Sequence, residues 1–145
     1  ITAFYSVLVE ADDPNEPISD CVRGLLDGHA WLSRRLASRG HYPAVDVLES
    51  LSRLMPEVST PQQREAADAV RRLLAVYREH EDLISVGAYR RGANRLVDIA
   101  IDMLPDIEQY LRQPVDQQAT FQQSLEGLLQ LYQQYQRRLS ETQNR

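Results

Sequence analysis

The stretch HYPAVDVLESLSR, His41–Arg53, decides the fold class of this chain. It predicts a strand over Tyr42–Val47 that begins next to a proline. Upstream, Ile1–Glu10 is rich in β-branched and aromatic residues with almost no polar break, which predicts a strand covered on both faces, as in a parallel sheet. Between the two strands, helical spacing predicts short helices over Ile18–Leu26 and His29–Ser38. The order strand, helices, strand is what a crossover in a parallel α/β sheet requires.

The chain changes character near Pro56–Pro61. Beyond this point apolar residues recur at helical spacing, so we expect an α/β part over residues 1–58 and an all-α part over residues 59–145. Thr60 is a favourable N-cap, and the proline that follows suits the first helical position. The predicted helical segments are Thr60 to about Val86, closed by Gly87; Leu96–Met103, ended by Pro105; Asp106–Leu111; and Phe121–Leu139.

Composition limits the classes of function. With 43% hydrophobic and 26% charged residues over 145 positions, the chain is globular. Its net charge of −5 argues against general binding to nucleic acid or anionic membranes. All 16 basic residues are arginine, so there is no G-x-x-x-x-G-K-[ST] loop to cradle a nucleoside triphosphate. The single cysteine, Cys21, excludes a disulfide framework within the chain and fits a reducing compartment. The apolar runs are far shorter than the roughly 20 residues of a membrane-spanning helix.

A cluster of carboxylates, Asp12, Asp13 and Glu16, suggests a magnesium site or acid–base chemistry. Neighbouring residues on a loop usually point apart, however, and an Asp-Asp-Pro turn or a helix-entry cap explains the same residues. We therefore interpret the cluster as structural. The three histidines are not spaced for a shared site, which argues against a metalloenzyme or a protease.

Three stretches of the sequence together carry a resemblance to a known family. They are ITAFYSVLVEADDPNEPISD, LLDGHAWLSRRLASRGHYPAVDVLESLSRLMP and, more loosely, EDLISVGAYRRGAN with Asp98 and Ala100-Ile101. The chain resembles the carboxy-terminal third of the ATPase that drives bacterial type III protein export, in the flagellum or the injectisome. That family is in turn similar to the catalytic subunits of rotary ATP synthases. Residues 104–145 agree only in helical character and in the segment QYLRQPV.

The resemblance implies a fold and an activity. Residues 1–58 would be the C-terminal strands and helices of a RecA-like P-loop ATPase core, and residues 59–145 a C-terminal helical bundle. The full-length enzyme would use ATP and Mg²⁺, with hydrolysis coupled to unfolding, chaperone release or delivery of export substrates. The flagellar branch is favoured over the injectisome. The upstream barrel, phosphate loop and catalytic glutamate of the family have no counterpart here, so we expect this fragment alone to hold no nucleotide and to be inactive.

The resemblance also implies an assembly and a location. The family forms a homohexamer that works with a central stalk protein, export chaperones and substrates, and the export-gate apparatus. It is cytoplasmic, associates peripherally with the inner face of the cell membrane and binds no nucleic acid. Because Ile1 opens directly on a strand pattern without an initiator methionine, we expect native residues to precede it. If the chain were naturally this short, the alternative is a non-enzymatic adaptor that uses the helical bundle for binding.

Matching the family motifs residue by residue assigns roles to three positions. Arg53 lies where the family places an arginine finger, which stabilises the transferred phosphoryl group in the neighbouring subunit. The alternative is a structural arginine paired with Glu49. Tyr42, in the word YPAVD, matches the aromatic residue that stacks on adenine, and Tyr110 would sandwich the base from the helical part. The alternative for both tyrosines is a core or rim position.

The stretch GAYRRGAN, residues 87–94, predicts a loop with glycine at each side of Arg90 and Arg91. A mobile, locally positive loop on an acidic chain suggests a contact surface for a central stalk or an export substrate. A solvated turn is the alternative.

Overall fold

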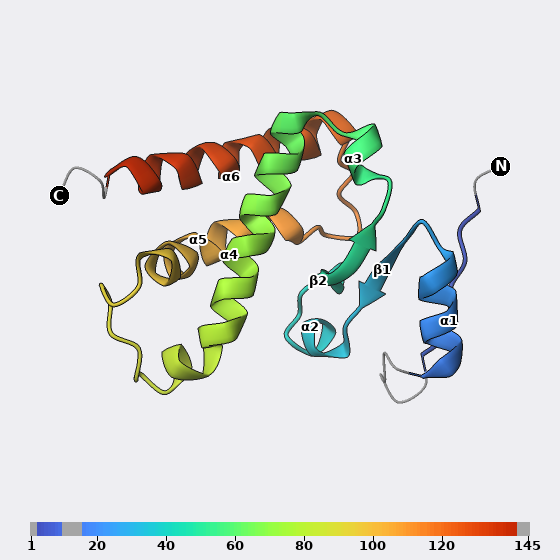
Figure 1. Cartoon of the computed structure of the whole chain (residues 1–145), viewed down its shortest axis with the longest axis horizontal. Coiled ribbons are helices and arrows are strands. Elements are labelled where there is room, and N and C mark those ends of the chain that lie inside the picture. The colour runs from blue at the N-terminus through green and yellow to red at the C-terminus, as the bar shows by residue number, and fades with distance from the viewer. Residues whose placement is uncertain (1–2, 10–15, 142–145) are drawn as a thin grey trace.

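The computed structural model describes residues 3–9 and 16–141. Within these ranges, short helices and a small sheet come first and three long helices follow (Figure 1). The elements are α1 (Pro17–Leu25), β1 (Gly28–Leu32), α2 (Arg34–Ser38), β2 (Val45–Ser52), α3 (Met55–Val58), α4 (Pro61–Ser85), α5 (Arg95–Leu111) and α6 (Phe121–Glu141). The predicted order of an α/β part followed by an all-α part is confirmed.

The described sheet is a pair of antiparallel strands, β1 and β2, in which Gly28 faces Ser52 and Leu32 faces Val45. The predicted helix over His29–Ser38 is therefore wrong in its first half. Its apolar residues pair with β2, and the helix begins only after Ser33, whose hydroxyl accepts the N–H of Leu36 at 3.5 Å. Gly28 allows the strands to approach, since a Cβ there would lie 2.6 Å from the carbonyl oxygen of Leu51.

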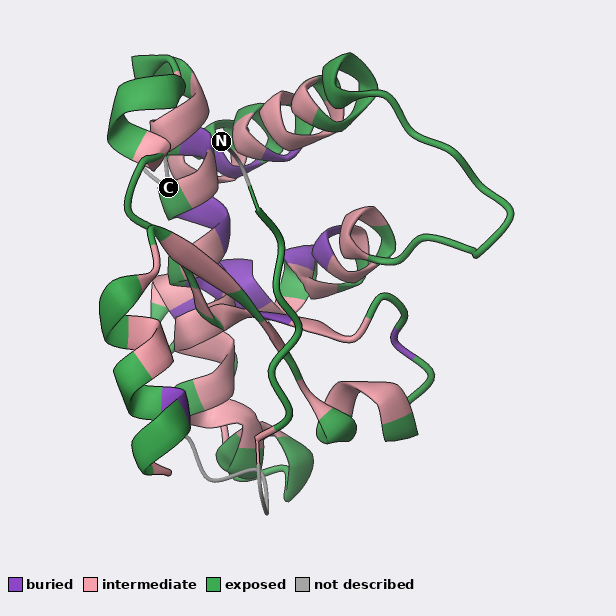
Figure 2. Cartoon of the chain, turned by 90° about the vertical axis from the view of Figure 1, so that its right-hand side faces the viewer, coloured by how far each residue is buried: buried purple, intermediate pink, exposed green. Residues whose placement is uncertain are grey.

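The N-terminal segment differs from its prediction as well. Residues 3–9 form no strand, and they run almost wholly exposed along the molecule (Figure 2). Phe4 is 96% and Leu8 is 92% exposed. A buried strand of a parallel sheet needs a neighbouring strand to bond to and helices over both faces. The described sheet consists of β1 and β2 alone, and residues 3–9 pair with neither. The expected parallel crossover is thus not formed among the described residues.

The helices α4, α5 and α6 enclose the hydrophobic core. Leu73, Met103 and Ile107 are almost fully buried there, with Leu131 and Tyr135 contributed by α6. The prediction for α4 is confirmed, including its cap, because the Thr60 hydroxyl accepts the N–H of Gln63 at 3.2 Å. The prediction of a last helix over Phe121–Leu139 is confirmed by α6.

The helix α5 is continuous through Pro105, so the predicted break there is wrong. Proline removes one hydrogen bond from a helix and usually ends it. Here Met103 and Ile107 lie on either side of the proline and are 0% and 1% exposed. Their burial in the core keeps both halves of α5 in line.

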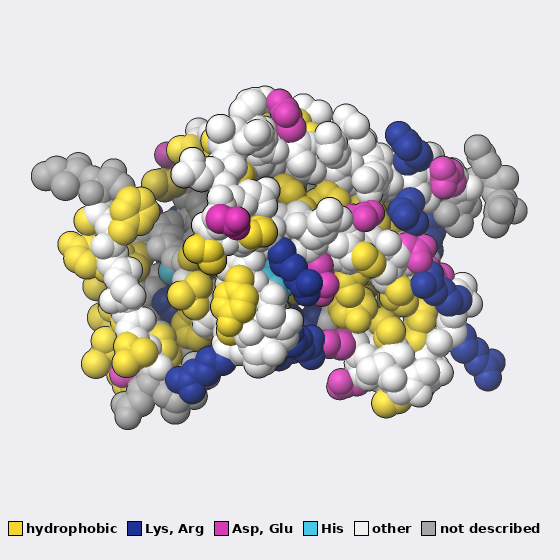
Figure 3. Space-filling view, turned by 180° about the vertical axis from the view of Figure 1, so that it is seen from behind, with side chains coloured by type: hydrophobic (Ala, Val, Ile, Leu, Met, Phe, Trp, Pro, Cys, Tyr) yellow, Lys and Arg dark blue, Asp and Glu magenta, His cyan; other side chains and the backbone are white. Residues whose placement is uncertain are grey.

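Seen from behind, hydrophobic side chains gather at the end that carries the N-terminal segment (Figure 3). Toward the other end, acidic and basic side chains surround a second group of hydrophobic ones. No helix within the described ranges is long and apolar enough to cross a bilayer.

Candidate functional site

Arg53 directly follows β2, and its side chain is exposed. Its backbone N–H donates to the carbonyl of Asp27 at 2.7 Å, which fixes the position of its backbone. The guanidinium makes a long hydrogen bond of 3.5 Å to the carbonyl of Arg23. Glu49, the alternative partner, binds Arg78 instead at 3.2 Å. Within the part of the chain that the structure describes, the charge of Arg53 is in no ion pair and can meet an anion from outside.

Tyr42 lies in the loop that leads into β2, and its side chain is 55% exposed. Its carbonyl accepts the N–H of Gln113 at 2.9 Å, which ties this loop to the segment after α5. The peptide bond between Tyr42 and Pro43 is cis. The ring thus offers a face to solvent at the boundary between the α/β part and the helices.

Tyr110, on α5, is held by α6. Its hydroxyl donates to the carbonyl of Ser124 at 3.0 Å, and burial raises the pKa of that hydroxyl. Gly127 lies against the ring, where a Cβ would come 3.0 Å from two ring carbons. Of the ring pairs formed by described residues, none joins Tyr110 to Tyr42. The hydrogen bond from Gln113 to Tyr42 nevertheless brings the two segments together.

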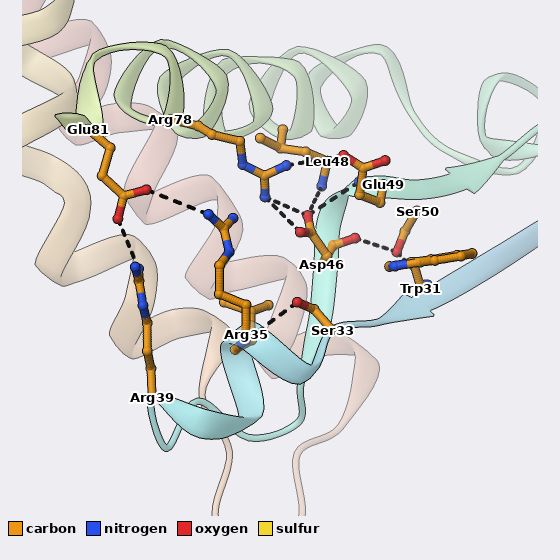
Figure 4. Close-up of polar contacts among 11 residues, drawn as sticks. Trp31, Ser33, Arg35, Arg39, Asp46, Leu48, Glu49, Ser50, Arg78 and Glu81 are labelled. Atoms are coloured by element: carbon orange, nitrogen blue, oxygen red, sulfur yellow. Dashed lines mark hydrogen bonds and ion pairs between the residues drawn. The ribbon is translucent and has the colours of Figure 1, made fainter. Parts of the chain in front are cut away.

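The main polar contact between the two parts of the chain centres on Asp46, a residue that the sequence did not single out. Asp46 lies in β2 and is 5% exposed. Its carboxylate receives two hydrogen bonds from one Arg78 nitrogen, at 2.7 and 2.8 Å, and it also accepts the N–H groups of Leu48 at 3.0 Å and Glu49 at 3.3 Å (Figure 4). Arg78 lies on α4, so this contact joins the sheet to the helical bundle.

Two opposing effects act on the pKa of Asp46. Burial alone raises it, but the hydrogen bonds and the charge of Arg78, together with the N–H groups of Leu48 and Glu49, outweigh burial and lower the pKa below its usual value. The carboxyl group therefore stays ionised at neutral pH, as a partner for Arg78 must.

Further contacts link α4 to the same region. Arg71 donates to the carbonyl of Ser50 at 3.3 Å. Glu81 accepts from Arg39 at 2.9 Å and lies 3.7 Å from Arg35, both on or next to α2 (Figure 4). The signal that sequence reasoning missed is the helical spacing of Arg71, Arg78 and Glu81, which places all three on one side of α4.

His41 is buried beside this contact and lines a cavity of ≈ 90 Å³ between α4, α5 and the sheet. Burial lowers the pKa of its imidazole, and the nearby charge of Arg112 lowers it further, while Glu108 acts in the opposite direction. The ring is thus favoured in its neutral form inside the junction.

The carboxylate cluster near the N-terminus is described only at Glu16, since Asp12 and Asp13 lie outside the described residues. Glu16 caps α1: its carboxylate accepts the N–H groups of Ile18 at 3.2 Å and Ser19 at 2.8 Å. For Glu16 the interpretation as a helix-entry cap is confirmed.

The loop 87–94 is attached to α5 instead of forming a free tip. Asp98 accepts the N–H of Gly92 at 2.8 Å and faces the Tyr89 hydroxyl at 3.0 Å. Arg91 pairs with Asp102, which raises the pKa of the guanidinium. The Arg90 side chain is exposed. Of the two arginines, Arg90 is therefore the better placed to meet a partner.

Two family models match different parts of the chain. Residues 1–52 match the nucleotide-binding domain of the ATP synthase alpha/beta family. Residues 59–130 match the type III secretion (EscN) ATPase C-terminal domain.

Individual relatives agree with these matches. The chain is 51% identical over 131 residues to the flagellum-specific ATP synthase of Bacillus subtilis, covering 90% of this chain and 30% of that protein. It is 58% identical over 117 residues to the SPI-2 type 3 secretion system ATPase of Salmonella typhimurium, covering 81% of this chain and 27% of the relative. The chain thus spans less than a third of the length of either relative.

Solved structures give the same result. The assembled ATPase EscN from the type III secretion system of enteropathogenic E. coli superposes with a TM-score of 0.82 at 37% identity, over 86% of this chain and 30% of that one. EscN in complex with its central stalk EscO gives a TM-score of 0.75 at 35% identity, over 80% of this chain and 29% of that one. The fold is thus that of the C-terminal part of an export ATPase.

Proposed function

Because this chain belongs to the flagellar and type III secretion ATPase family, we propose that it is the C-terminal part of an ATP-hydrolysing motor for bacterial protein export. The observation that carries the proposal is the position of Arg53: its guanidinium is exposed, free of any described ion pair and fixed at the end of β2. The proposal covers both branches of the family, since flagellar and secretion relatives are similarly identical to the chain.

In this proposal Arg53 acts on the nucleotide of a neighbouring subunit. Phosphoryl transfer concentrates negative charge on the transferred group, and a guanidinium supplied in trans stabilises that charge. An arginine held by a structural carboxylate would have to break that pair first. The exposed guanidinium of Arg53 has no such pair to break among the described residues.

The adenine base would stack on Tyr42, whose ring is accessible at the junction. Tyr110 would support the base from the helical part, with its ring held in place by α6. The chain has no lysine, so the phosphates and Mg²⁺ of ATP would be held by residues outside it. The proposed division into residues 1–58 and 59–145 is supported by the two separate family matches.

The proposed working form is a homohexameric ring with a nucleotide at each subunit boundary, because an arginine finger in trans requires a neighbour. EscN, the structural relative, is described as assembled and as bound to a central stalk. We extend both properties to this chain, with Arg90 and Arg91 as the stalk contact. Export chaperones, substrates and the export gate complete the proposed partners of a cytoplasmic enzyme at the inner face of the membrane.

Mixing two inactive variants of the full-length enzyme tests this proposal. One carries Arg53→Ala, and the other lacks the lysine of the phosphate loop. In mixed rings some boundaries pair an intact Arg53 with an intact phosphate loop, so ATP hydrolysis should partly recover. No recovery in rings shown to be mixed would exclude a role in trans, and no hydrolysis by the unmutated full-length protein would favour the adaptor.

A further inference from the structure

The strand β2 contains a bulge that lies between the two proposed nucleotide contacts. On β1 only Ala30 separates the paired residues His29 and Trp31, but their partners Leu51 and Asp46 are separated by residues 47–50. The extra residues of β2 turn out of the ladder. Bulges of this kind often re-aim side chains next to functional sites. This bulge sets the path of the chain from Tyr42 to Arg53.

Asp46 holds the bulge together from inside. Its carboxylate accepts the N–H groups of Leu48 and Glu49, which have left the ladder. Its carbonyl accepts the hydroxyl of Ser50 at 2.6 Å, and the same hydroxyl accepts the N–H of Trp31 at 2.9 Å (Figure 4). The conformation of the bulge therefore depends on the hydrogen bonds that the Asp46 carboxylate accepts.

Two arginines of α4, two helical turns apart, bind this bulge. Arg78 binds the Asp46 carboxylate twice and reaches Glu49 at 3.2 Å, while Arg71 binds the carbonyl of Ser50. Positions 71 and 78 are two turns apart, so both side chains leave the same side of the helix. The strand and the helix are consequently held at two points.

The other end of α4 is joined to the loop 87–94. The N–H groups of Ala88 and Tyr89 both donate to the carbonyl of Leu83, at 2.9 and 3.0 Å. The Tyr89 ring also meets His80 edge-on, with ring centroids 6.4 Å apart. Together with the contacts to Asp98, these bonds make the loop an extension of α4 and α5.

We propose that Arg78 is a positioning residue that couples the nucleotide segment to the loop 87–94. It acts through Asp46: β2, which follows the loop of Tyr42 and directly precedes Arg53, moves with α4, and α4 moves the loop 87–94. Arg78 itself touches no nucleotide in this scheme. The inference rests on the proposed function, since it assigns the nucleotide segment and the partner-facing loop the roles given above.

The burial of Asp46 explains why its contact with Arg78 couples β2 to α4 more strongly than the outer ion pairs do. A small shift of β2 along α4 would part the Asp46 carboxylate from its guanidinium while the carboxylate is still covered, and an unpaired buried charge is strongly unfavourable. The outer contacts of Arg35 and Arg39 with Glu81 are more exposed and are screened by solvent. The two elements thus move as one unit, which is the physical requirement for coupling between separate sites.

Hydrogen–deuterium exchange of the full-length ATPase, with and without a non-hydrolysable ATP analogue, tests the inference. In the unmutated enzyme the analogue should slow exchange both in residues 42–53 and in the loop 87–94. Arg78→Gln should retain the response of residues 42–53 and reduce that of the loop about fivefold or more, a size typical of lost allosteric coupling. Arg78→Lys should restore part of it. Arg72→Ala is the matched control, because Arg72 is exposed on the same helix; it should change neither response.

The outcomes separate this inference from the function on which it rests. A loop response that survives in Arg78→Gln would overturn the inference alone, as would an unmutated enzyme in which only residues 42–53 respond. An unmutated enzyme with no response in either region would overturn both. If Arg78→Gln does not fold, Asp46→Asn combined with Arg78→Gln removes both charges together and should show the same selective loss of the loop response.

Discussion

The two parts of the chain bury opposite kinds of residue. Among the described residues, the buried ones before α4 are all polar: Ser19, His41 and Asp46. In α4, α5 and α6 the buried residues are all hydrophobic, with Leu73 and Met103 at 1% and 0% exposure. The helical bundle thus has a core of its own, whereas the first part is held to it by ion pairs and hydrogen bonds. Substitutions in the hydrophobic core of the bundle should therefore cost the most stability, and substitutions at polar positions should mainly affect chemistry, coupling or the pH dependence of stability.

The largest expected effect is on the bundle core. Leu73→Ala should lower the free energy of unfolding by about 2–5 kcal/mol, because it removes buried methyl groups and leaves a cavity. Chemical denaturation followed by circular dichroism measures the loss. Leu83→Ala, at a 49% exposed position on the same helix, is the control and should cost much less. Equal losses for the two variants would mean that the bundle does not depend on its core.

The second prediction concerns chemistry. If Arg53 is the arginine finger proposed above, Arg53→Ala in the full-length protein should lower kcat by about two orders of magnitude or more, equivalent to about 2.7 kcal/mol, since such a finger acts mainly in the transition state. Nucleotide affinity and the unfolding midpoint should change little, because Arg53 is exposed. Steady-state hydrolysis and nucleotide binding, measured side by side, check both points. Equal losses of affinity and turnover would indicate a ground-state or structural role.

The same contrast explains what the sequence could predict. The helices of the bundle follow from hydrophobic periodicity, which reports local contacts on one face of a helix. The break at Pro105 was wrong because the burial of Met103 and Ile107, a tertiary effect, outweighs a local rule. The short run at β1 was ambiguous, since a few apolar residues fit a strand or a helix equally well.

The candidate site shows a similar limit. Arg53 and Tyr42 could be proposed from a contiguous motif, and the structure places both at accessible positions beside β2. Asp46 and Arg78 were missed because they are 32 positions apart in the sequence and meet only when β2 packs on α4. An ion pair between residues this far apart in the sequence leaves no local pattern to find.

The third prediction concerns His41, a buried polar residue of the first part, and the pH dependence of stability. The folded chain holds the pKa of His41 below its unfolded value of about 6.5. Between the folded and unfolded pKa values of His41, the unfolded chain binds more protons than the folded chain. The contribution of His41 to the free energy of unfolding is therefore fully present above the unfolded pKa and is lost as the pH falls toward the folded pKa. The unfolding midpoint should therefore decrease below about pH 6.5, and less so in His41→Gln. A midpoint with the same pH dependence in both proteins would assign the effect to other groups.

The smallest expected effect lies at the far end of the bundle, where ion pairs are exposed. Arg91 and Asp102 are 59% and 38% exposed, so Arg91→Ala should cost at most about 1 kcal/mol of stability.

Changing Arg90 and Arg91 together to glutamate should nevertheless weaken binding of the central stalk, more at low salt than at high salt, because the charges steer association through solvent. Basal hydrolysis should survive, since the described contacts of the loop 87–94 are with α4 and α5 and those of Arg53 are with Asp27 and Arg23. Binding assays across a salt series measure the effect, with Arg72→Glu as a control of the same charge change per residue. A stalk affinity that is unchanged at every salt concentration would place the contact elsewhere on the bundle and leave the loop 87–94 as a solvated turn.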